Sequence, residues 1–239
     1  MHFGVNDEFP GQAEDFSVWG FYKTPTPGTQ NSGILYSGIS EPPVFETKAG
    51  YYKNKVTISI KAKGEIRYTT DGSEPKTNST LYSKPFDINK TTVIRAICVE
   101  TAKLPSKIIT NTYFINDSSK LPIISISTTP ANLWDNTIGI YVAGTNGKTG
   151  WCSNVPVNWN QDWERPANIE YFDLTKSQVL NANAGIKISG GCSRTAAQKS
   201  LAVIARNKYG INSFQYQLFI NKPSKEYKSF LVRNHGNDF

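Results

Sequence analysis

Short stretches in which apolar and polar residues alternate occupy the middle of this 239-residue chain. They are residues 56–60, 66–70, 92–97 and 112–115. A period of two predicts strands with one buried and one exposed face. Asp71-Gly72 is a strong turn signal directly after the second stretch, so we expect the chain to reverse there. Short strands separated by turns predict a small antiparallel β-sandwich over residues 49–116.

Further strands are expected in the region that follows, residues 117–239. We expect them at residues 123–127, 138–142, 167–172, 185–188, 201–205 and 230–233. Residues 130–134 are expected to form a helical turn, and residues 143–160, rich in Gly, Asn and Ser, a loop. Because no long helical period is visible, the sequence predicts a mainly β chain, in which the sandwich is followed by a second β-rich lobe.

Residues 1–48 are rich in Gly, Pro and acidic residues, and we expect a tail and linker there. The whole chain has a net charge of +7. Many lysines of residues 51–116 alternate with Thr and Ser, which favours a solvated sheet face, and nucleic acid is not expected as a partner. No apolar run approaches the roughly 18 residues that a membrane span needs, and residues 1–30 lack the pattern of a signal peptide.

The three cysteines, Cys98, Cys152 and Cys192, form no CxxC pair and have no metal-ligand spacing, so a zinc site is not expected. Cys98 falls in the alternating stretch 92–99 and is expected to be a buried thiol. Cys152 and Cys192 both lie in turn-rich segments and could form a disulfide, which requires an oxidising compartment. The sequence leaves open whether they pair.

The sandwich region carries one resemblance. Ile66-Arg-Tyr-Thr-Thr-Asp-Gly-Ser-Glu-Pro75, followed by Leu81-Tyr-Ser-Lys-Pro-Phe86, resembles the chitobiase and β-hexosaminidase C-terminal domain over residues 50–115. The resemblance implies a fibronectin type III-like fold that accompanies enzymes without being catalytic. Three tyrosines could offer rings to sugars, although their period-two placement favours packing within the sandwich: Tyr68, Tyr82 and Tyr113.

The last region carries a second resemblance, in four segments. They are Trp159-Asn-Gln-Asp-Trp-Glu-Arg-Pro166, Gly185-Ile-Lys-Ile-Ser-Gly-Gly-Cys-Ser-Arg194, Gln198-Lys-Ser-Leu201 and Leu231-Val-Arg-Asn-His-Gly-Asn-Asp238. In this order they resemble the spore coat protein H (CotH) family of atypical secreted kinases. The resemblance implies the strand-rich first lobe of an α+β kinase-like fold, which transfers the ATP γ-phosphoryl group to a protein hydroxyl with Mg²⁺.

A shorter resemblance lies near the start of the chain. Phe16-Ser-Val-Trp-Gly-Phe-Tyr22 resembles the last strand of a lamin-tail-like domain, a module found ahead of CotH domains in large secreted bacterial proteins. Three parts are therefore expected: a lamin-tail-like remnant and linker at 1–48, the sandwich at 49–116, and the N-terminal part of a CotH-like domain at 117–239.

A nucleotide site needs backbone N–H groups or cations near the phosphates. The CotH resemblance suggests that these come from Gly190, Gly191, Ser193, Arg194 and Lys199. Glycines let the backbone approach an anion, while the arginine and the lysine supply charge. The same residues also fit a plain hairpin with a tight glycine turn and a solvated lysine.

Asp238 and Asn237 have the oxygen chemistry for Mg²⁺, although Asn-His-Gly-Asn is also ordinary turn chemistry. The family's catalytic and metal-binding carboxylates are expected beyond Phe239, so we expect this chain to be inactive alone. Glu170 is a possible ion-pair partner of Lys199, in the manner of a protein kinase.

A dense group of aromatic and charged residues precedes Pro166. They are Trp159, Asp162, Trp163, Glu164 and Arg165. They could bind a ligand or brace the loop, and bracing is favoured. Other catalytic schemes find little support, because there is no GxSxG or HExxH motif, no recognisable pair of sugar-cleaving acids, and only two isolated histidines.

The sequence thus predicts a fragment of a secreted or surface kinase that phosphorylates a secreted or surface protein on Ser or Thr, using ATP and Mg²⁺. The alternative is a non-catalytic extracellular module that binds polysaccharide or a cell surface. In both cases we expect an extracellular or cell-surface location, with the export signal upstream of Met1. The acceptor protein, the glycan and the oligomeric state do not follow from the sequence.

Overall fold

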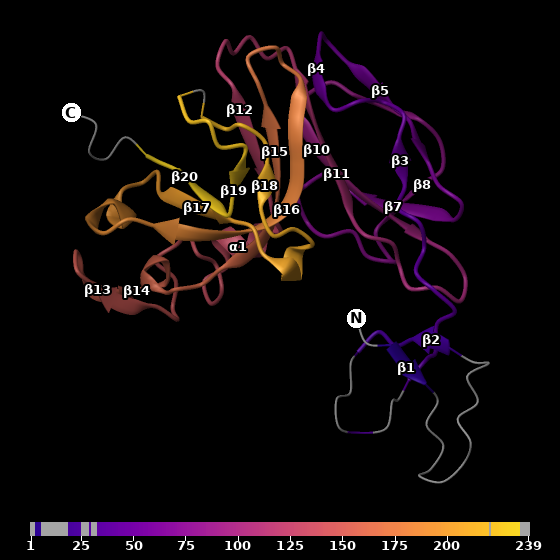
Figure 1. The fold of residues 1–239 in the computed structure, drawn as a ribbon, viewed down its shortest axis with the longest axis horizontal. Coiled ribbons are helices and arrows are strands. Elements are labelled where there is room, and N and C mark those ends of the chain that lie inside the picture. The colour runs from indigo at the N-terminus through magenta and orange to yellow at the C-terminus, as the bar shows by residue number, and fades with distance from the viewer. Residues whose placement is uncertain (1–2, 6–18, 25–28, 30–32, 220, 235–239) are drawn as a thin grey trace.

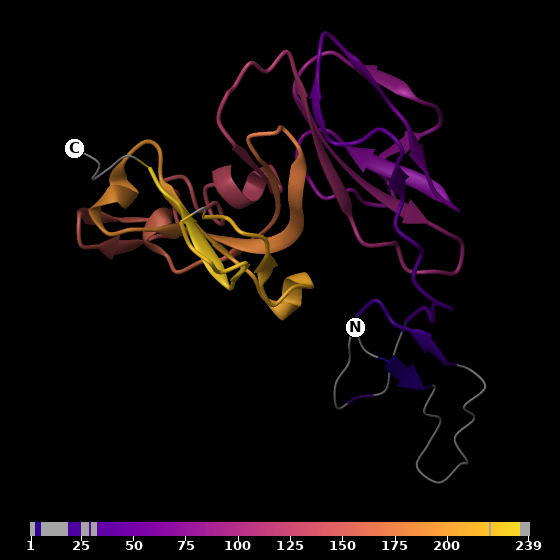
Figure 2. The same ribbon diagram turned by 45° about the horizontal axis from the view of Figure 1, so that its top comes forward.

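The computed structural model describes residues 3–5, 19–24, 29, 33–219 and 221–234. Near its start, β1 (Phe3–Val5) and β2 (Trp19–Phe21) form a two-stranded antiparallel sheet. Two larger β units follow, and they lie side by side in both Figure 1 and Figure 2. Of the segment that resembles a lamin-tail-like domain, residues 16–18 lie outside the described residues.

The first unit is a sandwich built on a five-stranded sheet. Its strands, in spatial order, are β4 (Gly50–Tyr52), β11 (Ile109–Ile115), β10 (Thr92–Val99), β7 (Glu65–Thr69) and β8 (Thr80–Tyr82). Two short antiparallel pairs add β3 (Val44–Phe45) with β6 (Ile60–Lys61), and β5 (Val56–Ile58) with β9 (Phe86–Ile88). Ile58 and Ile60 from the pairs share one core with Ile66, Ile94 and Tyr113 from the sheet, so apolar packing joins the two layers.

The four strands predicted from alternation in this unit are confirmed. Cys98 in β10 is a fully buried free thiol, as expected. The turn at Asp71-Gly72 is also present: Gly72 has a φ of 82°, and the Asp71 carboxylate accepts a hydrogen bond from the Ser73 backbone N–H at 3.0 Å. A glycine is suited to this position because it adopts a positive φ without steric cost.

The second unit is a five-stranded antiparallel sheet. Its strands, in spatial order, are β12 (Ile123–Ser127), β15 (Arg165–Phe172), β16 (Gln178–Ser189), β17 (Ser200–Ile204) and β20 (Ser229–Val232). Ile169, Ile186 and Val203 are fully buried in one core. Since neighbouring residues of a strand point to opposite faces, Glu170 lies on the other face from Ile169.

Shorter elements complete this unit. They are α1 (Pro130–Trp134), β13 (Lys148–Gly150), β14 (Ser153–Val157), η1 (Asn158–Asn160), η2 (Cys192–Thr195), η3 (Asn207–Tyr209), β18 (Phe214–Gln215) and β19 (Glu226–Tyr227). The helical turn predicted at residues 130–134 is confirmed as α1.

Two local predictions in this unit are wrong. Residues 138–142 form no strand, because the backbone N–H groups of Gly139, Ile140 and Tyr141 donate to carbonyls at the end of α1 and just after it. Residues 143–160 are not a plain loop, since β13 and β14 pair within them. The buried amide of Asn158 stabilises both segments, because it donates to the carbonyls of Asn136 at 2.9 Å and Gly139 at 3.1 Å.

The two units meet along β11 of the sandwich and the outer face of β12, β15 and β16. The Thr112 and Ser125 hydroxyls are 2.8 Å apart, and the Asn181 amide donates to the Thr110 carbonyl at 2.8 Å. Beside this polar contact, the rings of Phe114 and Phe172 pack edge to face at 5.0 Å. The interface is thus hydrogen-bonded as well as apolar.

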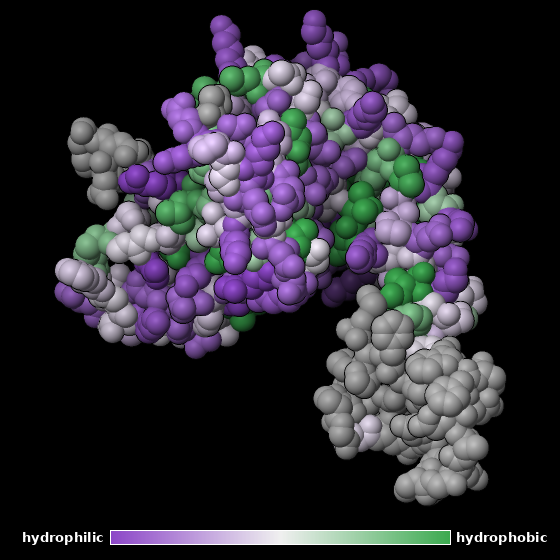
Figure 3. Space-filling view, viewed as in Figure 1, coloured by the Kyte–Doolittle hydropathy of each residue, from purple (hydrophilic) through white to green (hydrophobic). Residues whose placement is uncertain are grey.

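The mainly β fold class is confirmed. Three lysines of the sandwich, expected on a solvated face, are exposed and pair with acids, as Lys55–Asp87, Lys61–Glu46 and Lys63–Glu41. Hydrophilic residues cover most of the face in Figure 3. Within the described residues, no helix has the length and apolar character needed to cross a membrane.

Candidate functional site

A glycine turn joins β16 to β17 and forms the centre of the candidate site. Gly190 has a φ of 101°, and a Cβ built on it would lie 2.2 Å from the Ser193 hydroxyl oxygen. The positive φ therefore favours glycine at this position, whereas the Ser193 hydroxyl could rotate away from a Cβ. After the turn, η2 leads the chain to Lys199 and the start of β17.

Lys199 is buried, with 7% of its surface exposed. Its ammonium donates to the carbonyls of Arg194 at 2.8 Å and Ala196 at 2.9 Å. The same ammonium lies 3.9 Å from the centre of the Trp159 ring and 5.6 Å from that of Tyr141, within cation–π range. Burial lowers the pKa of Lys199, because an ammonium loses hydration there. The alternative left open from the sequence, that Lys199 is an ordinary solvated lysine, is therefore wrong, because its side chain is buried.

Arg194 turns back onto the loop. Its guanidinium donates to the carbonyl of Gly190 and, at 3.2 Å, to that of Trp159. The Trp159 indole N–H is buried and has no hydrogen-bond partner within the described residues. Arg194 therefore fixes the loop, and its position next to Gly190 keeps positive charge at the turn.

Asn234 joins this loop from the C-terminal side, and sequence reasoning missed it. Its buried amide donates to the carbonyls of Gln198 at 2.7 Å and Ser193 at 3.4 Å, and its oxygen accepts from the Ser200 hydroxyl at 3.0 Å. The segment that follows β20 is thereby tied to the glycine turn. A polar residue two positions after the end of an apolar strand was the available signal.

A disulfide joins the same loop to the β13–β14 hairpin. Cys152 and Cys192 pair, with their Cα atoms 5.0 Å apart, so the structure settles the pairing that the sequence left open. Trp151 next to it is 95% exposed. Three segments distant in sequence are thus held together around Lys199: the hairpin with Trp159, the glycine turn, and the residues after β20.

The ion pair expected between Glu170 and Lys199 is not formed. Glu170 lies on the opposite face of the sheet from the core, at the interface with the sandwich, and is fully buried there. Its carboxylate accepts hydrogen bonds from the backbone N–H of Thr112 at 2.9 Å and the amide of Gln178 at 2.7 Å. Glu170 therefore has a structural position between the two units.

The candidate metal ligands Asn237 and Asp238 lie outside the described residues. Within the described part of the chain, no group of three or more His, Cys, Asp or Glu could hold a metal ion. A buried cation beside a glycine turn, as at Lys199, fits an anionic group.

Two residues of the charged and aromatic group before Pro166, Glu164 and Arg165, brace the loop, as favoured from the sequence. Glu164 accepts hydrogen bonds from Arg206 at 2.8 Å and Tyr209 at 2.9 Å and pairs with Lys208 at 2.8 Å. Arg165 donates to the Ile138 carbonyl and lies 4.8 Å from the Trp163 ring centre. Glu164 and Arg165 lie outside the candidate site, whereas Trp159 of the same group belongs to it, because its ring packs against the Lys199 ammonium.

Comparison with known proteins identifies one family within the chain. Residues 47–110 match the family model of the chitobiase/beta-hexosaminidase C-terminal domain. The chain therefore contains a chitobiase C-terminal domain. Searches of the curated proteins and of the solved structures gave no significant match.

The three tyrosines considered from the sequence pack in the sandwich core or against it. Tyr113 is fully buried, Tyr68 stacks on Phe86 at 5.0 Å, and the hydroxyl of Tyr82 accepts a hydrogen bond from the Ile60 backbone N–H at 3.1 Å. Since all three tyrosines belong to the core or pack against it, their packing stabilises the sandwich, as their period-two placement indicated.

Proposed function

We propose that residues 117–239 are the strand-rich N-terminal part of a CotH-type protein kinase domain, and that the glycine turn with Lys199 holds the phosphate groups of ATP. The observation that carries this proposal is the buried ammonium of Lys199. Among the described residues its polar partners are two carbonyls, and no carboxylate forms a salt bridge with it. A buried charge without an opposite charge is costly, and a bound anion would relieve that cost.

Phosphoryl transfer depends mainly on positioning and on neutralising charge on the phosphates. Lys199 and Arg194 supply positive charge, while Gly190 and Gly191 allow backbone N–H groups to approach an anion. ATP fits this set of donors, and Mg²⁺ would supply further charge neutralisation when bound. We assign no catalytic carboxylate to the described residues.

In this proposal the complete protein phosphorylates Ser or Thr of a secreted or surface protein. The Cys152–Cys192 disulfide supports an extracellular or cell-surface location, because disulfides persist in oxidising compartments. The lamin-tail-like nature of residues 16–22 remains a prediction.

Binding, rather than turnover, tests the proposed site. Calorimetric titration of the chain with ATP, inorganic triphosphate and adenosine should show affinity for the first two and little for adenosine. Replacing Lys199 with Met keeps a long apolar side chain over Trp159 but removes the charge. Because a charge-assisted hydrogen bond contributes about 1.5–3 kcal/mol, Lys199→Met should weaken ATP binding by about tenfold to a hundredfold.

Lys222→Met is the matched control, since Lys222 is exposed and lies outside the glycine turn. It should bind ATP with unchanged affinity. Thermal unfolding of each variant establishes that it is folded. Equal ATP affinity in folded Lys199→Met and in the unaltered chain would remove Lys199 from the site.

The alternative function, a non-catalytic module for polysaccharide or a cell surface, draws support from the chitobiase C-terminal domain at residues 47–110. Its sandwich tyrosines, however, are packed against the core. Affinity for polysaccharide together with indifference to ATP and triphosphate would favour this alternative over the kinase proposal.

A further inference from the structure

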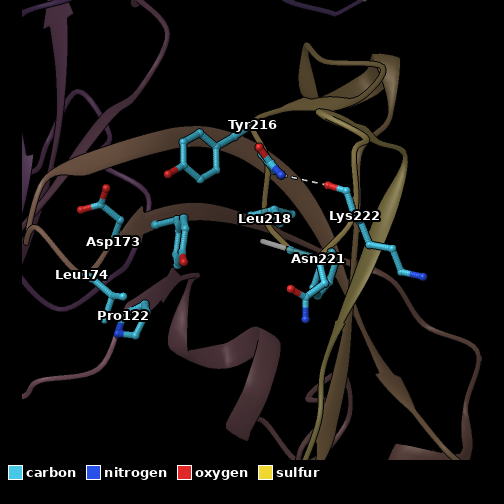
Figure 4. Close-up of a pocket in the computed structure, with 10 residues that line it drawn as sticks. Pro122, Asp173, Leu174, Tyr216, Leu218, Asn221 and Lys222 are labelled. Atoms are coloured by element: carbon cyan, nitrogen blue, oxygen red, sulfur yellow. Dashed lines mark hydrogen bonds between the residues drawn. The ribbon is translucent and has the colours of Figure 1, made fainter.

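A cleft of about 610 Å³ lies on the second unit, away from the glycine turn. It is lined by residues from the start of β12, the end of β15 and the segment after β18. Figure 4 shows Pro122 and Leu174 at the left, Tyr216 at the top, and Leu218 and Asn221 toward the right. The volume falls within the usual range for small-ligand sites.

Aromatic and aliphatic side chains form most of this lining. The rings of Tyr171 and Tyr216 meet edge to face at 5.7 Å. Leu174 and Phe219 border the cleft and are 64% and 46% exposed. Such exposed apolar surface is where a ligand with an apolar face gains most from leaving water.

The polar groups at the cleft are few and fixed. The Asp173 carboxylate accepts hydrogen bonds from the Thr175 backbone N–H at 2.9 Å and the Thr175 hydroxyl at 2.6 Å. The hydrogen bond from the Thr175 hydroxyl is the main reason that the pKa of Asp173 is lowered, so this carboxylate is ionised at neutral pH. In Figure 4 the Tyr216 hydroxyl points to the side where Asp173 lies.

Lys222 does not neutralise this charge inside the cleft. Its ammonium points away from the cleft in Figure 4, while its backbone carbonyl accepts a hydrogen bond from the Gln217 amide at 2.9 Å. The cleft therefore offers apolar surface, the hydroxyls of two tyrosines, the amides of Gln217 and Asn221, and one carboxylate. A carboxylate acceptor suits a ligand that brings hydroxyl donors and disfavours an anionic ligand.

We propose that this cleft binds a neutral oligosaccharide. One pyranose ring packs its C–H face against the apolar lining beside Tyr216 and Phe219, and its hydroxyls donate to Asp173 and exchange hydrogen bonds with Asn221 and the Tyr216 hydroxyl. A pyranose combines one apolar face with a rim of hydroxyl groups, which matches the mixture of groups in this cleft. The site is separate from the glycine turn and does not depend on the proposed kinase function.

Calorimetric or NMR titration of the chain with chitotetraose, cellotetraose and maltotetraose tests this site. At least one of these should bind with a Kd below about 10 mM. Tyr216→Ala should abolish measurable binding. Tyr216→Phe keeps the ring and should weaken binding about threefold to tenfold, the effect of one hydrogen bond, as should Asn221→Ala.

Trp151→Ala is the matched control, because Trp151 is an exposed aromatic residue that does not line the cleft. Its affinity for the bound oligosaccharide should be unchanged. Tyr216→Phe and Asn221→Ala remove few atoms, so they keep the test valid even where Tyr216→Ala fails to fold. Absence of binding to all three oligosaccharides, or equal binding by the unaltered chain and both conservative variants, would overturn the proposal.

Discussion

The carboxylate of Glu170 accepts a hydrogen bond from the backbone N–H of Thr112 at 2.9 Å, although the two residues are 58 positions apart and belong to different β units. The Thr112 hydroxyl donates to the other carboxylate oxygen. Both residues are buried. This contact fixes how the chitobiase C-terminal domain is seated on the sheet that carries the candidate nucleotide site.

Removal of the Glu170 carboxylate should destabilise the chain. Glu170→Ala leaves the Thr112 N–H and the Gln178 amide buried without their acceptor and opens a cavity, so we expect a loss of about 2–4 kcal/mol in the free energy of unfolding. Glu170→Gln keeps one acceptor oxygen and should cost less. Urea unfolding measures both, and Glu226→Ala, at an exposed position, should change stability by less than about 0.5 kcal/mol. A loss no greater than that of Glu226→Ala would contradict the role given to Glu170.

The stability conferred by Glu170 should depend on pH. Burial raises the pKa of Glu170 above its ordinary value of 4.5, despite the opposing hydrogen bonds from Thr112 and Gln178. The folded state then binds this proton more tightly than the unfolded state. The contribution to stability is therefore complete below about pH 4.5 and is lost as the pH rises through the raised pKa.

Urea unfolding of the unaltered chain and of Glu170→Gln, over a series of pH values, measures this effect. The free energy of unfolding of the unaltered chain, relative to the variant, should fall as the pH rises from about 4 to about 8. Parallel pH profiles of the two proteins would show that the pKa of Glu170 is the same in the folded and unfolded states.

Glu164 should show the opposite dependence on pH. Burial acts to raise its pKa, but hydrogen bonds from Lys208, Arg206 and Tyr209 outweigh burial and lower the pKa below 4.5. Its stabilising contribution is therefore present above about pH 4.5 and is lost as the pH falls through the lowered pKa. Only 11% of the Glu164 side chain is exposed, so Glu164→Gln should cost about 1–3 kcal/mol at neutral pH and less in acid.

Glu65→Gln is a suitable control for Glu164→Gln. Glu65 also pairs with an arginine, Arg67 at 2.6 Å, but 59% of the Glu65 side chain is exposed. A surface ion pair of this kind contributes about 0–1 kcal/mol. If both variants lose the same stability at neutral pH, Glu164 does not brace the loop as described.

The Cys152–Cys192 disulfide should stabilise the second unit. It closes a loop of 40 residues, for which the chain-entropy model gives about 3–4 kcal/mol. A reducing agent should lower the urea midpoint of the unaltered chain. The double variant Cys152→Ser/Cys192→Ser should have that lower midpoint already and should not respond to the reducing agent, whereas an unchanged midpoint in the double variant would count against this contribution.

Local patterns were sufficient to predict most strands of both units. Alternation located β7 and β10, and apolar runs located β12, β15 and β17. These patterns can be recognised locally, because neighbouring residues of a strand alternate between its two faces. The same reasoning wrongly predicted a strand at residues 138–142. Their apolar residues belong to a segment that folds back on α1, and the carbonyls that hold it come from residues 132–135.

The candidate site was predictable only in part. Residue types pointed to Gly190 and Lys199, but the Trp159 ring under the ammonium and the amide of Asn234 come from other segments, and no spacing in the sequence encodes such contacts. Glu170 was assigned to the wrong partner for the same reason. Its place on β15 was visible, whereas the sandwich strand that covers this face of the sheet was not.

The most direct measurement of the central claim is the change in backbone amide NMR shifts of isotope-labelled chain when ATP is added. The largest changes should fall on Gly190, Gly191, Ser193, Lys199 and Asn234, and inorganic triphosphate should reproduce them while adenosine does not. Unchanged shifts at the glycine turn at saturating ATP, or changes confined to other regions, would contradict the claim that this loop holds phosphate.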